Sequence, residues 1–287
     1  MALSCFCADR CCAQASLHKP HWWLTESQWF RHTVGMAEDP RYHIRVKPED
    51  VGDYVLLPGD RDRVERIAKH LDDARVVGEN REYRTMTGTL DGTPVSVMSS
   101  GMGCPCVAIG IEELRTAGVH TVIRVGTTGA IGPGPRLGDA IIAQAALRSD
   151  GTSKAYIEST YPAVADFDVT DALRRAAVSA QHPHHVGLVE SSDAYYAGSW
   201  HGEAASAERM QLLQRAGVLS IEMEAATLYV VGRLRGLRTG CVLTLREEWS
   251  EDGSRVQAGD EFEGGLDKVI RIAVQGVRNL IELDNSK

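Results

Sequence analysis

The spacing of apolar residues switches between two periods from Tyr54 onwards. Short runs of β-branched and other apolar residues predict buried strands, and apolar residues that recur every three or four positions predict helices. Strands are expected at Tyr54–Leu57, Tyr83–Leu90, Pro94–Ser99, Asp139–Ala145, Val186–Ser191 and Thr239–Thr244, and in the run that begins at Val122. Helices are expected at Val64–Leu71, Val107–Leu114, Thr170–Ala180, Ala204–Ala216, Glu222–Arg235 and Leu266–Leu283.

The order of these elements predicts the fold class. Strands alternate with helices, except for a hairpin that the Asp91-Gly92 pair indicates. Such alternation is typical of an α/β protein whose mixed, mostly parallel twisted sheet is covered by helices on both faces. No internal repeat, low-complexity segment or linker follows Met36, so we expect a single domain over residues 36–287.

The first 35 residues differ from the rest of the chain. They show little periodicity and contain the crowded cysteines Cys5, Cys7, Cys11 and Cys12. We expect an unstructured extension, or a start codon assigned too early with Met36 as the true first residue. A transit peptide is the alternative, because this segment, like transit peptides, contains few acidic residues. The cysteine spacing matches no usual zinc pattern, so no metal site is expected.

Charge and hydropathy narrow the class of function. The formal net charge is −8 and the pI is about 5.7, which argues against a nucleic-acid or anionic-membrane binder. No apolar run approaches the roughly 18–20 residues that a membrane-spanning helix needs. We therefore expect a soluble, cytoplasmic protein whose partners are small molecules rather than nucleic acid or membrane.

Two segments combine arginines with small or hydroxyl-bearing residues. In Val122–Ile131 a strand is expected to open into a Gly-Thr-Thr-Gly loop, and a buried strand rarely carries an arginine such as Arg124 unless its charge is paired. In Pro58–Arg63 a glycine-containing loop leads into a helix N-terminus, where free N–H groups favour an anion. Arginine forks and threonine hydroxyls together indicate a phosphate site. Ordinary turns are the alternative interpretation.

Two acidic residues, Glu222 and Glu224, stand at the expected start of a helix. Acidic side chains there can simply stabilise the helix dipole. One of them could instead accept hydrogen bonds from a sugar diol, which needs a fixed carboxylate. No Ser/His/Asp or Cys/His arrangement indicates a covalent nucleophile, and Cys104 and Cys106 are interpreted as small buried residues.

Seven segments, in this order, resemble the nucleoside phosphorylase-I superfamily, and within it most closely the uridine phosphorylases. They are Leu56–Val64, Asn80–Tyr83, Ser100–Gly103, Ile123–Ile131, Tyr161–Phe167, Ser191–Asp193 and Ile221–Ala226. The resemblance covers about Tyr42 to Ile281. It implies the nucleoside phosphorylase/hydrolase-like fold and reversible phosphorolysis of a nucleoside to free base and (deoxy)ribose 1-phosphate. Inorganic phosphate would be the co-substrate, and no cofactor is expected.

The same resemblance implies the site residue by residue. Phosphate is expected to contact Gly59, Arg63, Arg81, Arg124 and Thr127, with Arg81 reaching the site of the neighbouring subunit. Ribose is expected to contact His43, Met223 and Glu224, with His43 crossing the same boundary. The base is expected to contact Thr128, Gly129, Tyr195, Ser199, His201 and Glu222. The expected catalytic residues are Arg124, Glu224 and Arg63. Shared sites imply a homo-oligomer, usually a hexamer built as a trimer of dimers.

The resemblance fails at the base site. Ser199 and His201 stand where uridine phosphorylases carry a glutamine and an arginine that read uracil, and neither replaces those groups. Beyond the next expected strand the chain reads Leu-Arg-Glu-Glu-Trp, in which Arg246 could supply the missing charge. Glu247 or Glu248 could instead protonate a purine nitrogen.

The favoured substrate is uridine, because Ser149–Thr152 and Tyr161–Phe167 look more uridine-like than purine-like. A purine or modified nucleoside is the alternative. Two other classes stay open: a nucleosidase, which uses water on the same fold, and a non-catalytic nucleoside-binding homologue. The arginines at positions 63, 81 and 124 argue against a nucleosidase, because water needs no cationic cradle.

Overall fold

The computed structural model describes residues 41–196, 204–249, 255–257 and 259–287. The chain from Arg41 to Lys287 forms one compact unit. The extension expected at residues 1–35, and the alternative start at Met36, lie outside the described residues and stay predictions.

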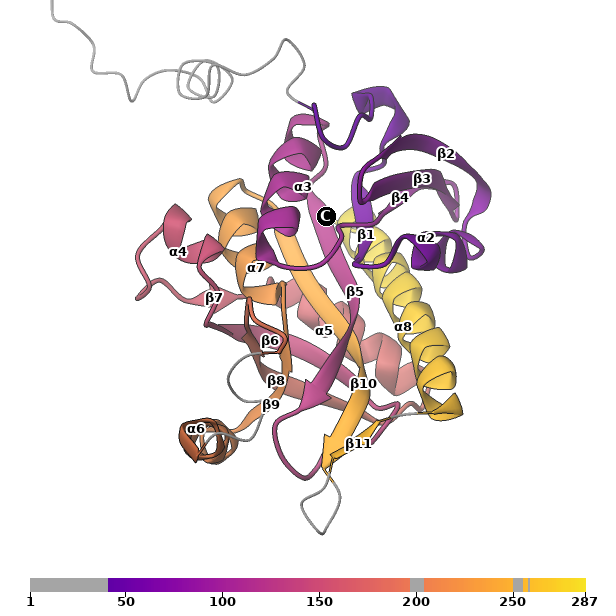
Figure 1. Cartoon of the computed structure of the whole chain (residues 1–287). Coiled ribbons are helices and arrows are strands. Elements are labelled where there is room, and N and C mark those ends of the chain that lie inside the picture. Colours follow the sequence, from indigo (N-terminus) through magenta and orange to yellow (C-terminus); the bar gives the residue numbers. More distant parts are fainter. Residues whose placement is uncertain (1–40, 197–203, 250–254, 258) are drawn as a thin grey trace, which may run out of the picture. The chain divides into compact units, whose positions relative to one another are not determined.

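Within the described residues, one eleven-stranded sheet is flanked by helices (Figure 1). The strands are β1 (Tyr54–Pro58), β2 (Asp72–Asn80), β3 (Tyr83–Leu90), β4 (Thr93–Met98), β5 (Thr121–Ala130), β6 (Ala140–Arg148), β7 (Ala163–Val164), β8 (His184–Ser191), β9 (Val218–Glu222), β10 (Arg238–Trp249) and β11 (Arg255–Gln257). The helices are η2 (Pro48–Asp50), α2 (Arg61–Ala68), α3 (Cys104–Thr116), α4 (Thr152–Tyr156), α5 (Phe167–Ser179), α6 (Ala204–Arg215), α7 (Ala225–Leu234) and α8 (Asp260–Asn285).

The sheet closes on itself at its centre. β5 pairs in parallel with β10 and antiparallel with β9, while β9, β8 and β6 are joined by parallel pairs. An antiparallel pair between β6 and β10 completes the ring. From β5 the sheet continues outward through β1, β4, β3 and β2. The mixed α/β fold predicted from the sequence is confirmed, but its closure depends on β9, a strand that the apolar pattern did not reveal.

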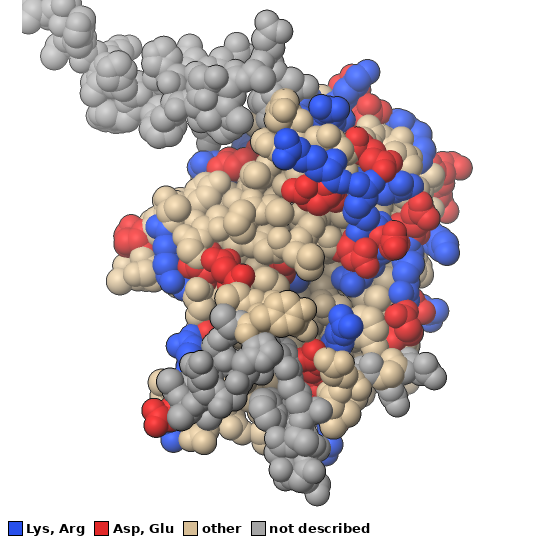
Figure 2. Space-filling model, viewed as in Figure 1, with Lys and Arg blue, Asp and Glu red and all other residues tan. Residues whose placement is uncertain are grey.

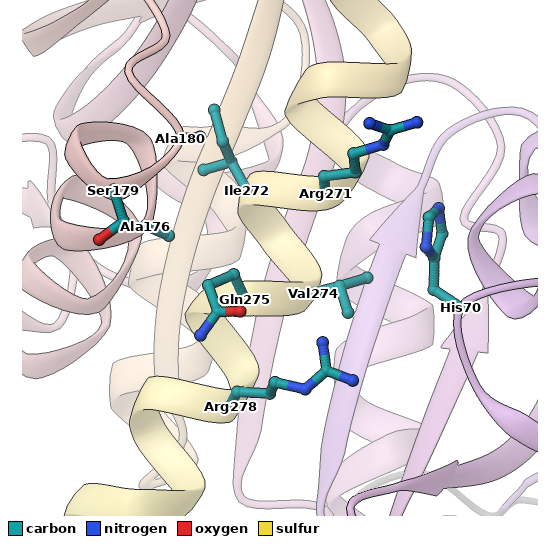
Figure 3. Close-up of a pocket in the computed structure, with 9 residues that line it drawn as sticks. All are labelled: His70, Ala176, Ser179, Ala180, Arg271, Ile272, Val274, Gln275 and Arg278. Atoms are coloured by element: carbon teal, nitrogen blue, oxygen red, sulfur yellow. The ribbon is translucent and has the colours of Figure 1, made fainter.

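Helices cover both sides of the sheet, as predicted. On one side α3 and α7 pack together, and residues such as Ile111 and Leu228 join the apolar cluster under the sheet. On the other side α5 and α8 pack on each other and against β10, with Leu173 and Val277 in a second cluster that includes α2. A pocket opens between α5, α8 and His70 on that side (Figure 3).

Charged side chains are unevenly distributed on the face drawn in Figure 2. They gather over β2, β3 and α2, whereas the surface over α3 and α7 is largely uncharged. Among the described helices, none is both long and apolar enough to cross a membrane. The part of the chain that the structure describes holds no cluster of three or more His, Cys, Asp or Glu placed to bind a metal ion.

The prediction of a loop at Gly126–Gly129 is wrong, because β5 continues through these residues to Ala130. Both edges of the strand are occupied there, since Gly129 pairs with Ile221 of β9 and Thr128 pairs with Leu245 of β10. Ladder partners on two sides hold these small residues in an extended conformation that their sequence alone does not favour.

The helix start expected at Glu222 is also wrong. Glu222 is the last residue of β9, and α7 begins at Ala225 with Glu224 as its N-cap. Pairing of Glu222 with Ser191 of β8 keeps the backbone extended up to that point.

β10 leaves no room for a side chain where it faces α5. A Cβ added to Gly240 would lie 2.3 Å from Cγ1 of Val169. We expect Gly240→Ala to lower the free energy of unfolding by about 1–3 kcal/mol, because packed cores relax only partly around added atoms. The matched control is Gly264→Ala in α8, where a Cβ meets nothing within 4 Å and stability should stay level or rise. Denaturant unfolding measures both, and equal losses would contradict the packing argument.

Candidate active site

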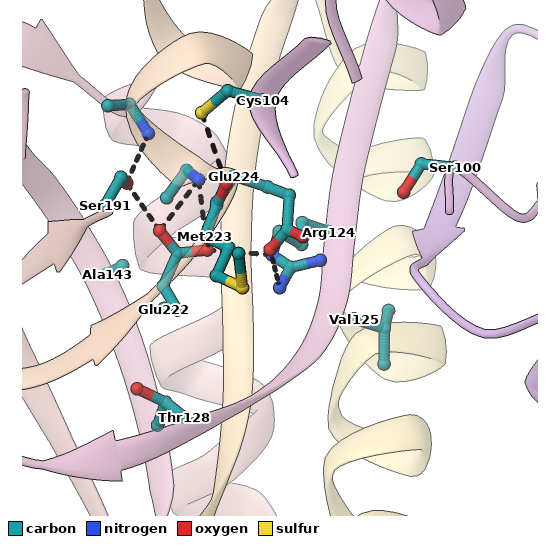
Figure 4. A network of polar contacts seen from close by, with 12 residues as sticks. Ser100, Cys104, Arg124, Val125, Thr128, Ala143, Ser191, Glu222, Met223 and Glu224 are labelled. Atoms are coloured by element: carbon teal, nitrogen blue, oxygen red, sulfur yellow. Dashed lines mark hydrogen bonds and ion pairs between the residues drawn. The ribbon is translucent and has the colours of Figure 1, made fainter. Parts of the chain in front are cut away.

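Arg124 of β5 lies at the centre of a buried polar network (Figure 4). Only 5% of the residue is exposed. Its Nε donates to Oε2 of Glu222 at 3.1 Å, and its Nη2 forms an ion pair with Oε2 of Glu224. Burial alone would lower the pKa of the guanidinium, but the carboxylates of Glu224 and Glu222 raise it above its usual value. Arg124 is therefore a fixed positive charge.

Glu222 organises the start of α7. Its carboxylate accepts the backbone N–H groups of Glu224 and Ala225, each at 2.9 Å, and the hydroxyl of Ser191. With Arg124 as a further donor, both carboxylate oxygens have partners. This geometry favours a positioning role for Glu222 over the base contact expected from the sequence.

Glu224 joins the starts of two helices. Its Oε1 accepts the backbone N–H of Gly103, which precedes α3, at 2.6 Å. The neighbouring Met223 carbonyl accepts the Sγ–H of Cys104 at 3.2 Å. Burial raises the pKa of Glu224, and the charge of Arg124 opposes that rise. The ribose residues Met223 and Glu224, expected from the motif, thus lie beside Arg124.

A second arginine, Arg63, lies close enough to Arg124 for their charges to repel each other. Nη1 of Arg63, on α2, donates to the carbonyl of Val125 at 3.2 Å. Burial and then the charge of Arg124 lower the pKa of Arg63 to about 10, although Asp60 opposes this. At neutral pH both guanidiniums are charged, so an anion placed near them would relieve their repulsion.

Two backbone loops complete this end of the site. The N–H of Gly101 donates to the carbonyl of Gly59 at 3.0 Å, and the N–H of Ser100 donates to Pro58 at 2.9 Å. A Cβ on Gly59 would lie 3.2 Å from the Gly101 carbonyl and 3.9 Å from Nη1 of Arg124. Glycine therefore keeps the backbone near the arginine accessible, as a phosphate site requires.

The far end of β5 holds the residues expected to face phosphate and base. The Thr128 hydroxyl donates to the Ile221 carbonyl at 2.8 Å, so its proton is already used. Thr127 is partly exposed, and Gly129 pairs with both Ile221 and Glu247. Of the two threonines, Thr127 therefore has the freer hydroxyl for a ligand.

His43 and Arg81 lie together and apart from this network. The Asn80 side chain donates to the His43 carbonyl at 2.7 Å, and Arg81 is the next residue in the turn between β2 and β3. Nδ1 of His43 lies 2.6 Å from Oε1 of the buried Glu113. Neither His43 nor Arg81 bonds to Arg124 in this chain, so their expected contacts with ligand stay predictions.

Arg246, Glu247 and Glu248 were the three candidates for contacting the base. Their side chains lie in different surroundings in the structure, and Glu247 differs most from the other two. Arg246 points outward and lies over the Phe262 ring at 5.4 Å. Oε2 of Glu248 accepts the backbone N–H of Leu137 at 2.8 Å. Glu247 is only 3% exposed and faces inward on β10.

Partners of Glu247 come from the same region. The Gln257 amide on β11 donates to its Oε1 at 3.3 Å, and the Tyr195 hydroxyl donates to the same oxygen at 3.4 Å. Tyr195, expected to contact the base, thus touches Glu247, and its contact with a ligand stays a prediction. The other two expected base residues, Ser199 and His201, fall outside the described residues and stay predictions.

Sequence reasoning gave no role to Ser191, Gly103 or Gln257. Ser191 and Gly103 lie within motifs that carried the family resemblance, but their function is to hold Glu222 and Glu224. No sequence feature pointed to Gln257, because β11 is a short strand that pairs, among the described residues, with β10 alone.

Comparison with known proteins supports the motif analysis. The family model of the phosphorylase superfamily matches residues 53–282. The chain is 46% identical over 257 residues to a uridine phosphorylase of Thermococcus kodakarensis, covering 87% of this chain and 90% of that protein. It is 37% identical over 248 residues to a guanosine phosphorylase of Halorubrum lacusprofundi, covering 86% of this chain and 97% of that protein. A solved uridine phosphorylase structure from Vibrio fischeri matches with a TM-score of 0.75 at 31% identity. The match covers 85% of this chain and 99% of that one.

The chain therefore belongs to the phosphorylase superfamily. This confirms the resemblance read from the motifs, the fold class that it implied and the expectation of an enzyme.

The raised pKa of Glu224 predicts a pH dependence of stability. A carboxyl with a raised pKa binds its proton more tightly in the folded state, so its contribution to stability is full below the ordinary value of 4.5 and is lost as the pH rises through the folded pKa. Relative to Glu224→Gln, the wild type should therefore lose unfolding free energy over that range. Denaturant titrations between about pH 4 and pH 8 measure the difference. The exposed control Glu282→Gln should follow the wild type, and a Glu224→Gln curve parallel to the wild type would contradict the burial argument.

Proposed function

We propose that the protein catalyses the reversible phosphorolysis of a nucleoside, with uridine as the first candidate, to give free base and (deoxy)ribose 1-phosphate. The observation that carries this proposal is the buried Arg124, fixed between Glu222 and Glu224 with Arg63 beside it. The uridine phosphorylases of Thermococcus kodakarensis and Treponema pallidum, 46% and 44% identical, support uridine as the substrate.

The arrangement suits phosphate as the nucleophile. Arg63 and Arg124 would hold phosphate beside Gly59 and Thr127, in line with the bond between sugar and base. Positive charge develops on the sugar in an oxocarbenium-like transition state, and a fixed phosphate anion stabilises it. The Glu224 carboxylate would accept the 2′- and 3′-hydroxyls of ribose and so hold the sugar in place. No covalent intermediate and no cofactor are needed.

We further propose that sites are shared between subunits of a homo-oligomer, a hexamer in the first instance. Asn80 and Glu113 fix His43, and Arg81 lies beside it in an exposed turn, where both can reach a neighbouring chain. The largely uncharged surface over α3 and α7 offers a face for such contacts. The reaction would place the enzyme in nucleoside catabolism and salvage in the cytoplasm.

A purine nucleoside is the second candidate, and Glu247 favours it. A carboxylate only accepts hydrogen bonds. Guanine offers two adjacent donors, N1–H and N2–H, which match two carboxylate oxygens, whereas uracil offers one N–H between two carbonyl oxygens. The 37% identical guanosine phosphorylase of Halorubrum lacusprofundi shows that the relatives of this chain include one named for a purine nucleoside.

Base release should depend strictly on phosphate. Omitting phosphate should abolish turnover, and Glu224→Gln should lower kcat/KM by about 10²-fold or more, because a ribose contact that tightens in the transition state is lost. The control Glu282→Gln, on the exposed end of α8, should retain activity. Chromatography of released base measures both. Equal rates without phosphate would identify a nucleosidase, and binding without turnover across a nucleoside panel would identify a non-catalytic homologue.

Glu247→Gln should separate the two candidate bases. If the carboxylate pairs with guanine, the variant should lose about tenfold or more in kcat/KM for guanosine and change little for uridine, because an unpaired buried group is costly. Glu248→Gln is the matched control, since its side chain can still accept the Leu137 N–H. No guanosine turnover by the wild type, with uridine kinetics unchanged in Glu247→Gln, would rule out the second candidate.

A further inference from the structure

A pocket of about 320 Å³ lies away from the Arg124 network, between α5, α8 and the segment that follows α2 (Figure 3). From α8 it is lined by Arg271, Gln275 and Arg278, and from the opposite wall by His70. Small residues of α5 form its remaining side. Figure 3 shows both arginines extending from α8 toward the side on which His70 lies.

The spacing of the α8 residues explains why they line one hollow. Positions 271, 275 and 278 are separated by four and three residues, so they form a single stripe along the helix. The two arginines stand about 10 Å apart along the helix axis, at 1.5 Å per residue. The buried Ile272 and Val274 also line the pocket and give it an apolar floor.

The charges in this pocket are not balanced within the described residues. Arg278 donates through Nε to Asp91 at 2.8 Å, a bond that leaves its two terminal nitrogens for other partners. Arg271 forms no hydrogen bond or ion pair with any residue that the structure describes. The nearest acidic neighbour on α8, Asp267, already accepts from Arg66 at 2.7 Å. The pocket therefore carries a net positive charge.

The positive charge of the pocket affects the pKa of His70. Burial and Arg271 lower the pKa of the imidazole, Asp267 opposes them, and Arg278 lowers it further. The ring is therefore mainly neutral at pH 7 and keeps one N–H donor. An anion bound between the arginines would reverse the electrostatic part of this shift and favour the protonated ring.

We propose that this pocket binds a phosphate group, either as inorganic phosphate or as a phosphate monoester, at a second site separate from the active site. Guanidinium forks match the oxygens of a tetrahedral phosphate better than any other side chain does. Arg271 and Arg278 would hold the oxygens from two turns of α8, and His70 would donate a third hydrogen bond from the facing wall. The proposal does not depend on which base the enzyme accepts.

Titration calorimetry with inorganic phosphate and with glycerol 3-phosphate tests the site. At about pH 6.5, near the ordinary pKa of histidine, we expect the wild type to take up more protons on binding than His70→Gln does, seen as a difference in how the heat depends on the ionisation enthalpy of the buffer. The double variant Arg271→Gln/Arg278→Gln should weaken this binding by about tenfold or more, because charge-assisted hydrogen bonds are lost. The comparison with His70→Gln isolates the histidine, because a phosphate monoester itself titrates at about pH 6.

The matched control is Arg174→Gln, which removes an exposed arginine of α5 that pairs with Asp171 and lies outside the pocket. It should bind both ligands as the wild type does, and kcat should be unchanged in the double variant. Tighter binding of glycerol 3-phosphate would assign the site to a phosphorylated metabolite, and tighter binding of inorganic phosphate would assign it to phosphate itself. Wild-type affinity for both ligands in the double variant, or no binding beyond the active site, would overturn the proposal.

Discussion

The burial of Arg124 is the constraint on which the rest of the site depends. A charged guanidinium removed from water is costly unless carboxylates face it, and Glu222 and Glu224 supply them from the junction of β9 and α7. That junction also binds Ser191 at the end of β8 and Gly103 at the start of α3. One arginine of β5 thereby fixes the ends of β8 and β9 and the starts of α3 and α7 relative to one another.

The same network leaves two groups in surroundings that disfavour their own charge. Arg63 is partly buried beside Arg124 and has a lowered pKa, and Glu224 is buried and has a raised pKa. Perturbations of this kind collect where a ligand is bound. A phosphate between the arginines and sugar hydroxyls against Glu224 would supply the missing partners. The account of function therefore follows from electrostatics as well as from family membership.

The apolar pattern located the strands and helices that bury one face, and it failed where burial does not decide the structure. β2 is a mostly exposed edge strand, and β9 carries buried polar residues, so neither shows the expected periodicity. Gly126–Gly129 have the composition of a turn and become a strand only through pairing with β9 and β10. The motifs pointed to Arg63, Arg124 and Glu224, which the structure brings together. The positioning role of Glu222 depends on Ser191, which is distant in sequence.

The most direct test of the central claim is a crystal structure of the protein with ribose 1-phosphate bound. Our account predicts that the phosphate oxygens lie within hydrogen-bond distance of the guanidiniums of Arg63 and Arg124, and that the 2′- and 3′-hydroxyls lie on the carboxylate of Glu224. A bound sugar phosphate whose phosphate touches neither arginine, or whose hydroxyls lie away from Glu224, would contradict it.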